Sequence, residues 1–211
     1  HGNKIAKEFV VCKPLPNDPN SVIYVIPEKT SDQEEFCWTG DIHLLKTDSK
    51  SGKVVVHSIL ENAIESDAIR LYKIWIDTVP YFISENKRAF AIRLKYANNS
   101  RAAGYDSEES MLFEEKNNNF IKILGLVTFK SLSYDGGECE NSELRNQRST
   151  IIIDKKNSNK NYFNIFEKIH YEHYFLNKDC EEGKKETKDF TNIYYYSDST
   201  YICKGEPKEG F

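Results

Sequence analysis

The middle of the chain, residues 66–101, carries the clearest alternation of apolar and polar positions. Successive side chains of a β-strand point to opposite faces, so such alternation predicts strands with one buried face. In residues 71–77 the predicted buried face consists of Tyr72, Ile74 and Ile76. In residues 89–96 it consists of Phe90, Ile92, Leu94 and Tyr96. A proline and a Ser-Glu-Asn cluster separate the two strands, which predicts a hairpin at the centre of the core.

Shorter strand patterns, separated by turn residues, recur along the rest of the chain. Residues 61–68 are consistent with either a short helix or a crossing loop, and residues 162–175 form the longest apolar stretch. An aromatic content of 13% and a single Met also favour strands over helices. We therefore predict a mainly-β fold, an antiparallel β-sandwich or barrel-like sheets with long polar loops and little helix. Residues 1–211 are expected to form a single domain, although a break near 138–147 could subdivide it.

Charge and hydropathy argue against a nucleic-acid partner and against a membrane-spanning segment. The formal net charge is -4, and no basic stripe follows the chain, so no nucleic-acid interface is expected. The apolar runs are too short and interrupted to predict a transmembrane segment. The chain begins with His1 rather than Met, which is compatible with removal of a signal or lipoprotein leader.

The cysteines bear on the compartment. The chain has five, none in a CxxC pair, so zinc spacing is absent. Their positions beside turns and strand ends favour disulfides of an exported protein, and the alternative is free thiols in a cytosolic one. Cys139 and Cys180 are the preferred pair, because each lies in a loop rich in acidic residues and glycine. The remaining disulfide candidates are Cys12, Cys37 and Cys203.

Candidate catalytic chemistry is sparse. His170 and His173 would fall on opposite faces of a strand, so they do not predict a metal site. His43 and His57 lie on neighbouring predicted strands, where either could accompany Asp41, but no nucleophile motif accompanies them. The sequence contains no P-loop and no dinucleotide fingerprint, so no cofactor is expected. A hydrolase remains the less favoured class.

Aromatic side chains on a polar face give the remaining lead. Trp75 alternates with Lys73 and Asp77, which favour water, so it is either a binding residue or part of a second core layer. The neighbouring loops would supply a polar rim. The predicted binding residues are Trp75, Lys73, Glu85, Asn86, Lys87, Asn99, Arg101 and Tyr105.

Three segments carry a family resemblance: residues 66–70 (SDAIR), residues 76–81 (IDTVPY) and residues 88–93 (RAFAIR). They resemble a group of exported, largely uncharacterised proteins of Gram-negative bacteria with the patterns S-D-A-I-R-F, L-D-T-A-x-Y and R-A-F-G-V-R. Ala91 replaces the expected Gly and Leu71 the expected aromatic residue. The resemblance implies a β-rich fold and a periplasmic or otherwise exported location. It implies no catalytic residue, and the family is loosely of the inhibitor and toxin-immunity type.

These observations lead to two hypotheses of function. The leading one is a non-enzymatic periplasmic immunity or inhibitor protein, which blocks a secreted toxin or cell-wall hydrolase by steric occlusion. Its partner would be a protein, bound through aromatic anchors and a polar rim. The alternative is a carbohydrate- or peptidoglycan-binding module that stacks sugar rings on the same aromatic side chains.

Overall fold

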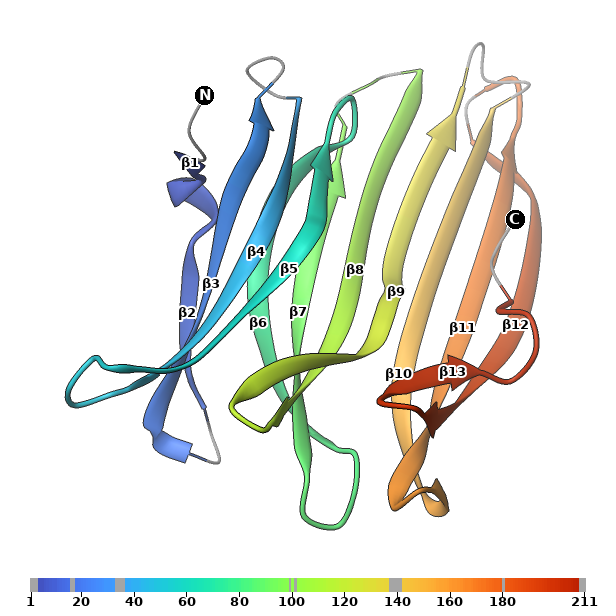
Figure 1. The fold of residues 1–211 in the computed structure, drawn as a ribbon. Coiled ribbons are helices and arrows are strands. Elements are labelled where there is room, and N and C mark those ends of the chain that lie inside the picture. Colours follow the sequence, from blue (N-terminus) through green and yellow to red (C-terminus); the bar gives the residue numbers. More distant parts are fainter. Residues whose placement is uncertain are drawn as a thin grey trace.

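The computed structural model describes residues 4–15, 18–32, 37–98, 100, 102–136, 142–179 and 181–208. These residues form thirteen β-strands and one short 3-10 turn, η1 (Lys7–Phe9). The strands make two antiparallel sheets that do not close into a barrel (Figure 1). The mainly-β class predicted from the sequence is confirmed. No helix in the described part of the chain is long and apolar enough to cross a membrane.

The smaller sheet is built by the N-terminal third of the chain. Its order is β1-β3-β4-β5, and β2 also pairs with β3. The strands are β1 (Lys4–Ile5), β2 (Val11–Leu15), β3 (Asp18–Asp32), β4 (Trp38–Asp48) and β5 (Val54–Ser66). β5 continues as a strand to Ser66, so residues 61–66 form neither the helix nor the crossing loop considered for residues 61–68. The crossing between the two sheets is confined to residues 67–69.

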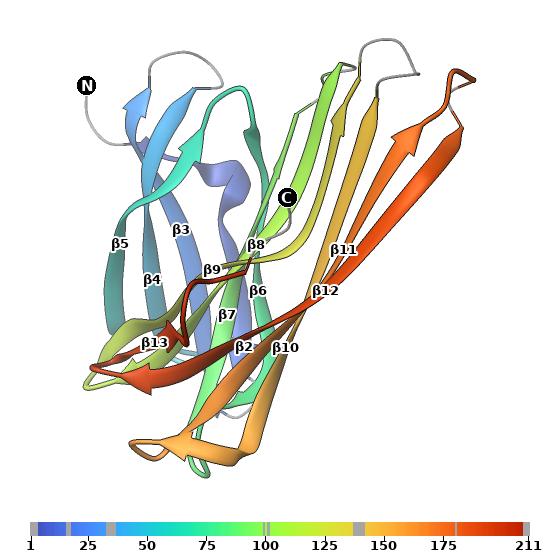
Figure 2. The same cartoon turned by 90° about the vertical axis from the view of Figure 1, so that its right-hand side faces the viewer.

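The larger sheet follows the order of the chain from β6 to β13. The strands are β6 (Arg70–Phe82), β7 (Arg88–Ala97), β8 (Ala103–Lys116), β9 (Asn119–Asp135), β10 (Glu143–Asn159), β11 (Tyr162–Leu176), β12 (Glu182–Ser197) and β13 (Thr200–Cys203). β9 pairs with β10 along Lys130–Asp135, and β13 lies against β9. Viewed from the side, the smaller sheet and the upper parts of β10 to β12 diverge from one another (Figure 2).

The predicted hairpin is present as β6 and β7, and one of its faces forms the core between the two sheets. Phe90, Ile92 and Leu94 are buried there, and Tyr96 packs against them. The smaller sheet contributes buried side chains to the same cluster, among them Ile23, Ile42, Leu44 and Trp38. The predicted buried face of β7 is therefore confirmed.

The buried face of β6 differs from the prediction at one position. The register between β6 and β7 shifts between Leu71 and Lys73. This bulge places an extra residue in β6, and Tyr72 is 70% exposed while Leu71 is 5% exposed. Leu71 thus joins Ile74 and Ile76 in the core, and the assignment of Tyr72 to the core was wrong.

A second core lies on the opposite face of β7. Ala89 and Ala91 pack there in a cluster with Tyr162, Tyr196 and Tyr201 from the C-terminal strands. The main-chain amide of Phe163 donates to the carbonyl of Ile83, 2.8 Å away, which ties β11 to the β6–β7 turn. Both faces of β7 are consequently buried near that turn, although alternation predicted only one buried face.

The described cysteines contradict part of the disulfide expectation. Cys12, Cys37 and Cys203 are free thiols. The preferred pair, Cys139 and Cys180, lies outside the described residues.

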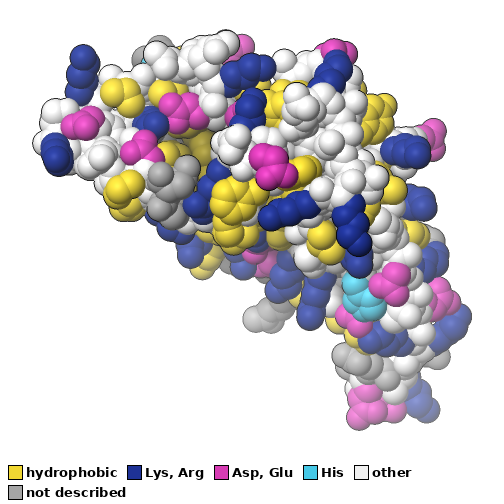
Figure 3. Space-filling model, turned by 90° about the horizontal axis from the view of Figure 1, so that it is seen from below, with side chains coloured by type: hydrophobic (Ala, Val, Ile, Leu, Met, Phe, Trp, Pro, Cys, Tyr) yellow, Lys and Arg dark blue, Asp and Glu magenta, His cyan; other side chains and the backbone are white. Residues whose placement is uncertain are grey.

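On the face seen in Figure 3, basic and acidic side chains are interspersed with hydrophobic ones, so this face carries no extended field of one sign.

Candidate binding groove

A polar groove of about 650 Å³ lies on the inner face of the larger sheet, beyond the part covered by the smaller sheet. Strand register brings its floor together, because Tyr105 on β8 and Arg145 on β10 both lie opposite Ser133 on β9. In the same way Gln147 lies opposite Ser131. Residues at opposite positions of antiparallel strands share a face, so these polar side chains line one surface.

A buried carboxylate lies at one end of the groove. Glu167 on β11 is 4% exposed and lies opposite Asn192 on β12. The Asn192 side-chain amide donates to Oε2 of Glu167 at 2.9 Å, and the Tyr194 hydroxyl donates to the same oxygen at 2.8 Å. Burial and the neighbouring Glu167 carboxylate both raise the pKa of Tyr194, so its hydroxyl keeps its proton and remains a donor. These bonds satisfy a charge that would otherwise be costly to bury.

Asn192 also holds a piece of main chain in the groove. Its Nδ2 donates to the Lys208 carbonyl at 3.1 Å, and the Lys208 amide donates to its Oδ1 at 2.9 Å. The same segment is fixed at Lys204, whose amide donates to the Ile193 carbonyl at 2.7 Å. A side-chain amide that both donates to and accepts from one residue recognises the main chain regardless of its sequence.

Charged side chains mark the other end of the groove. Arg145 donates to Glu143 at 2.6 Å, and Nε2 of His173 lies 3.1 Å from the same carboxylate. Arg145 and then His173 hold the pKa of Glu143 below its usual value. Nε of Arg145 is buried and has no hydrogen-bond partner among the described residues. The guanidinium therefore retains an unused donor beside the groove.

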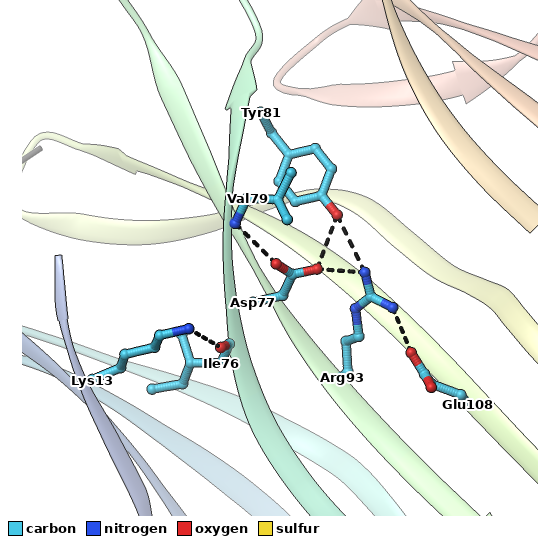
Figure 4. Close-up of polar contacts among 7 residues, drawn as sticks. All are labelled: Lys13, Ile76, Asp77, Val79, Tyr81, Arg93 and Glu108. Carbon is cyan, nitrogen blue, oxygen red and sulfur yellow. Dashed lines mark hydrogen bonds and ion pairs between the residues drawn. The ribbon is translucent and has the colours of Figure 1, made fainter. Parts of the chain in front are cut away.

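A separate charged network braces the opposite face of β6 and β7 (Figure 4). Arg93 pairs with Asp77 and with Glu108, and its guanidinium lies 3.8 Å from the ring centre of Phe129. The Asp77 carboxylate also accepts the Val79 amide at 2.9 Å and the Tyr81 hydroxyl at 3.0 Å. This network connects β6, β7 and β8 and does not line the groove.

Titration in this network follows from burial and charge. Burial alone would raise the pKa of Asp77, but the Val79 amide and the Arg93 guanidinium outweigh it and lower the pKa. Burial, followed by the Asp77 charge, raises the pKa of Tyr81 to about 12. Nearby, Lys13 on β2 donates to the Ile76 carbonyl at 3.3 Å and ties the smaller sheet to β6 (Figure 4).

The predicted binding residues do not form one surface. Tyr105 lines the groove, whereas Trp75 is half-buried with the Lys73 ammonium 5.7 Å from its ring centre. Glu85 and Asn86 are exposed in the β6–β7 turn. Asn99 and Arg101 lie outside the described residues.

Lys87 has a structural role that was not predicted from the sequence. Its ammonium donates to the buried Glu114 carboxylate at 2.7 Å and lies 4.5 Å from the ring centre of Tyr162. The Tyr162 hydroxyl also donates to Glu114, at 2.7 Å. Lys87 thus satisfies a buried charge at the second core, and only part of its side chain faces solvent.

The histidines make local contacts. Nε2 of His43 lies 2.8 Å from Glu28, and its Nδ1 lies 3.0 Å from Nε2 of His57. The ring centres are 5.3 Å apart, as expected when one imidazole hydrogen-bonds another end to end. The Asp41 carboxylate instead accepts a hydrogen bond from the main-chain N–H of Asn62, at 2.8 Å. Within the described ranges, no three His, Cys, Asp or Glu side chains gather in a way that could hold a metal ion.

Sequence reasoning missed Glu167 and Asn192. They are 25 positions apart, and only the register of β11 and β12 joins them. One signal was present, because Glu167 falls on the same alternating face as the buried Ile165, Ile169 and Tyr171. A carboxylate on an apolar face needs a buried partner, so it could have been selected as a candidate.

Comparisons with protein-family models, with curated proteins and with solved structures find no match. The resemblance to exported inhibitor-like proteins therefore stays a prediction.

Proposed function

We propose that the protein is a non-enzymatic binding protein that holds an extended segment of another polypeptide in its inner groove. One observation carries this proposal: the Asn192 side-chain amide forms two hydrogen bonds with the main chain of Lys208, one as donor and one as acceptor. Main-chain recognition provides affinity without dependence on sequence, and neighbouring side chains then provide specificity. Arg145, Gln147 and Tyr105 supply polar and aromatic contacts along the remaining floor.

The biological form that we propose is an exported inhibitor or immunity protein. A broad β scaffold that captures a loop or terminus of a toxin or cell-wall hydrolase would occlude the enzyme sterically. Support comes from the resemblance of residues 66–93 to exported proteins and from the groove's mixed polar and aromatic lining. The groove replaces Trp75 as the centre of the binding surface in this proposal, and Tyr105 is retained.

Selection of phage-displayed random peptides on the immobilised protein tests the proposal. Selected peptides should bind in fluorescence anisotropy, and Ser133→Trp, which fills the floor, should weaken binding by at least about tenfold. Ser158→Trp is the matched control, because Ser158 is exposed on β10 and does not line the groove. Failure to select any peptide whose binding depends on Ser133 would refute the proposal.

A carbohydrate ligand is the second candidate. It is favoured by the half-buried tyrosines of the groove, Tyr105 and Tyr194, which lie among serine hydroxyls and side-chain amides. Such surfaces stack sugar rings and hydrogen-bond their hydroxyl groups. Isothermal titration with peptidoglycan fragments should then show millimolar or tighter binding that Tyr105→Ala abolishes. Retention of that binding in Tyr105→Ala would dismiss the groove as a sugar site.

A further inference from the structure

A second hollow adjoins the groove where β5 leaves the larger sheet uncovered. It measures about 460 Å³ and lies between residues 62–69, at the end of β5 and the turn that follows it, and Ser107 and Glu109 on β8. Tyr105 and Leu126 line both the hollow and the groove, so the two lie next to each other. A polypeptide lying in the groove could therefore extend a side chain into this hollow.

The hollow carries negative charge that the described Lys and Arg side chains do not pair. Glu65, Asp67 and Glu109 all line it. No Lys or Arg of the described residues forms an ion pair with any of them. Glu109 is half-buried, and this burial raises the pKa of its carboxyl group. These carboxylates do not belong to any metal-binding group among the described residues, so an organic cation fits the site better than a metal ion.

A buried hydroxyl gives independent evidence for a ligand. Ser107 lines the hollow and is 1% exposed, yet its Oγ has no hydrogen-bond partner in the described structure. A buried polar atom without a partner costs free energy, so such atoms mark positions that a ligand or water completes. Ser107 is opposite Tyr96 on β7, and burial followed by the Glu109 charge raises the pKa of Tyr96. Glu109, Ser107 and Tyr96 therefore meet on one wall.

We propose that this hollow binds an arginine side chain of the polypeptide held in the groove. A guanidinium offers five N–H donors on a planar, permanently charged group. It can satisfy Glu109 and the Ser107 hydroxyl together while its face lies against Tyr96 or Tyr105. This inference rests on the proposed function, since it assigns the specificity of the same groove.

Titration of the ¹⁵N-labelled protein with N-acetyl-arginine methylamide, followed by NMR, tests the hollow directly. The matched probe is N-acetyl-citrulline methylamide, which has nearly the same shape but no charge. The arginine probe should shift amide signals of residues 62–69 and 105–109 and bind about tenfold more tightly than the citrulline probe. Equal binding of the two probes would overturn the inference.

Substitutions locate the binding within the hollow. Glu109→Gln should weaken the arginine probe by about fivefold or more, because it removes the most buried charge. Glu181→Gln is the matched control, since Glu181 is exposed in the β11–β12 turn. If Glu109→Gln fails to fold by circular dichroism, Glu65→Gln replaces it, because Glu65 is exposed and tolerates the change. Arginine binding that neither variant weakens would place the probe elsewhere and refute the assignment.

The peptide selection separates failure of this inference from failure of the proposed function. Groove-dependent peptides enriched in arginine support both. Groove-dependent peptides without a basic preference contradict the hollow as an arginine site but leave the peptide groove intact. If no groove-dependent peptide is selected, the proposed function fails even where the isolated arginine probe binds.

Discussion

Arg93 joins two carboxylates across three strands, and its environment makes it hard to replace. Its side chain is mostly buried, as is that of Asp77. Removing one partner of a buried ion pair leaves the other charge uncompensated, at a cost of about 3–5 kcal/mol. We therefore expect Arg93→Ala to lower the free energy of unfolding by about 3–5 kcal/mol in urea denaturation.

Lys95 provides the control for this prediction on the same strand. It pairs with Asp106 at 2.7 Å, but both side chains are about one-third exposed. A pair that remains in water contributes little, so Lys95→Ala should cost less than about 1 kcal/mol. Similar losses for the two variants would show that burial of the Asp77–Arg93 pair does not determine its contribution.

Glu172 is expected to make the stability of the fold depend on pH in the acid range. Hydrogen bonds from Lys185, at 2.5 Å, and from Asn146, at 2.9 Å, lower the pKa of Glu172 to about 2. Because the folded pKa is depressed, this contribution is fully present above about pH 4.5 and is lost as the pH falls toward 2. Glu172→Gln should thus be less stable than the wild type by about 1 kcal/mol at pH 6, since the pair lies near the surface.

Urea denaturation at several pH values checks this. The difference between wild type and Glu172→Gln should shrink between pH 4.5 and pH 2. A difference that is constant over this range would show that the Glu172 charge is not its source.

At the scale of elements, the bulge in β6 reverses what simple alternation predicts. Leu71 is buried and Tyr72 is exposed. Loss of a buried leucine costs about 2–5 kcal/mol, whereas truncation of an exposed residue usually costs less than about 0.5 kcal/mol. Leu71→Ala should therefore lower the midpoint of urea denaturation markedly, and Tyr72→Ala should leave it nearly unchanged. If Tyr72→Ala lost more stability than Leu71→Ala, Tyr72 rather than Leu71 would be the buried residue, which would contradict the bulge.

Alternation predicted the class of fold and the main core because most strands are amphipathic over several residues. The Phe90, Ile92 and Leu94 face follows the pattern without interruption and was found directly. Alternation did not predict the bulge in β6 or the second core, and the reason is physical. A bulge depends on the partner strand rather than on local pattern, and Ala89 and Ala91 are too small to reveal burial on the second face of β7.

The binding surface was less accessible to sequence reasoning than the fold. Tyr105 was selected because it lies in a polar loop beside the hairpin, and the structure places it on the groove floor. The other components come from strands distant in sequence and meet through register alone, as Ser133 does between Tyr105 and Arg145. Register over many strands depends on every turn and bulge between them, so no single sequence motif could predict the groove.

For the whole molecule, the arrangement of the groove suggests competition between the chain's own C-terminal segment and a partner. Residues 204–208 occupy the Asn192 end, held by the Lys204 and Lys208 main-chain bonds. Any peptide that uses Asn192 must displace this segment. Occupation of a site by a competing segment reduces apparent affinity in proportion to the fraction of molecules left open.

A variant that ends at Cys203 should therefore bind the selected peptides more tightly, by about tenfold if the segment fills the site nine-tenths of the time. Fluorescence anisotropy on the wild type and the shortened variant measures the change. A synthetic peptide of residues 204–208, Lys-Gly-Glu-Pro-Lys, should compete for the shortened variant. Combining the truncation with Ser133→Trp controls for binding outside the groove, because the gain should then disappear. Weaker binding by the shortened variant would instead make residues 204–208 part of the binding surface rather than its competitor.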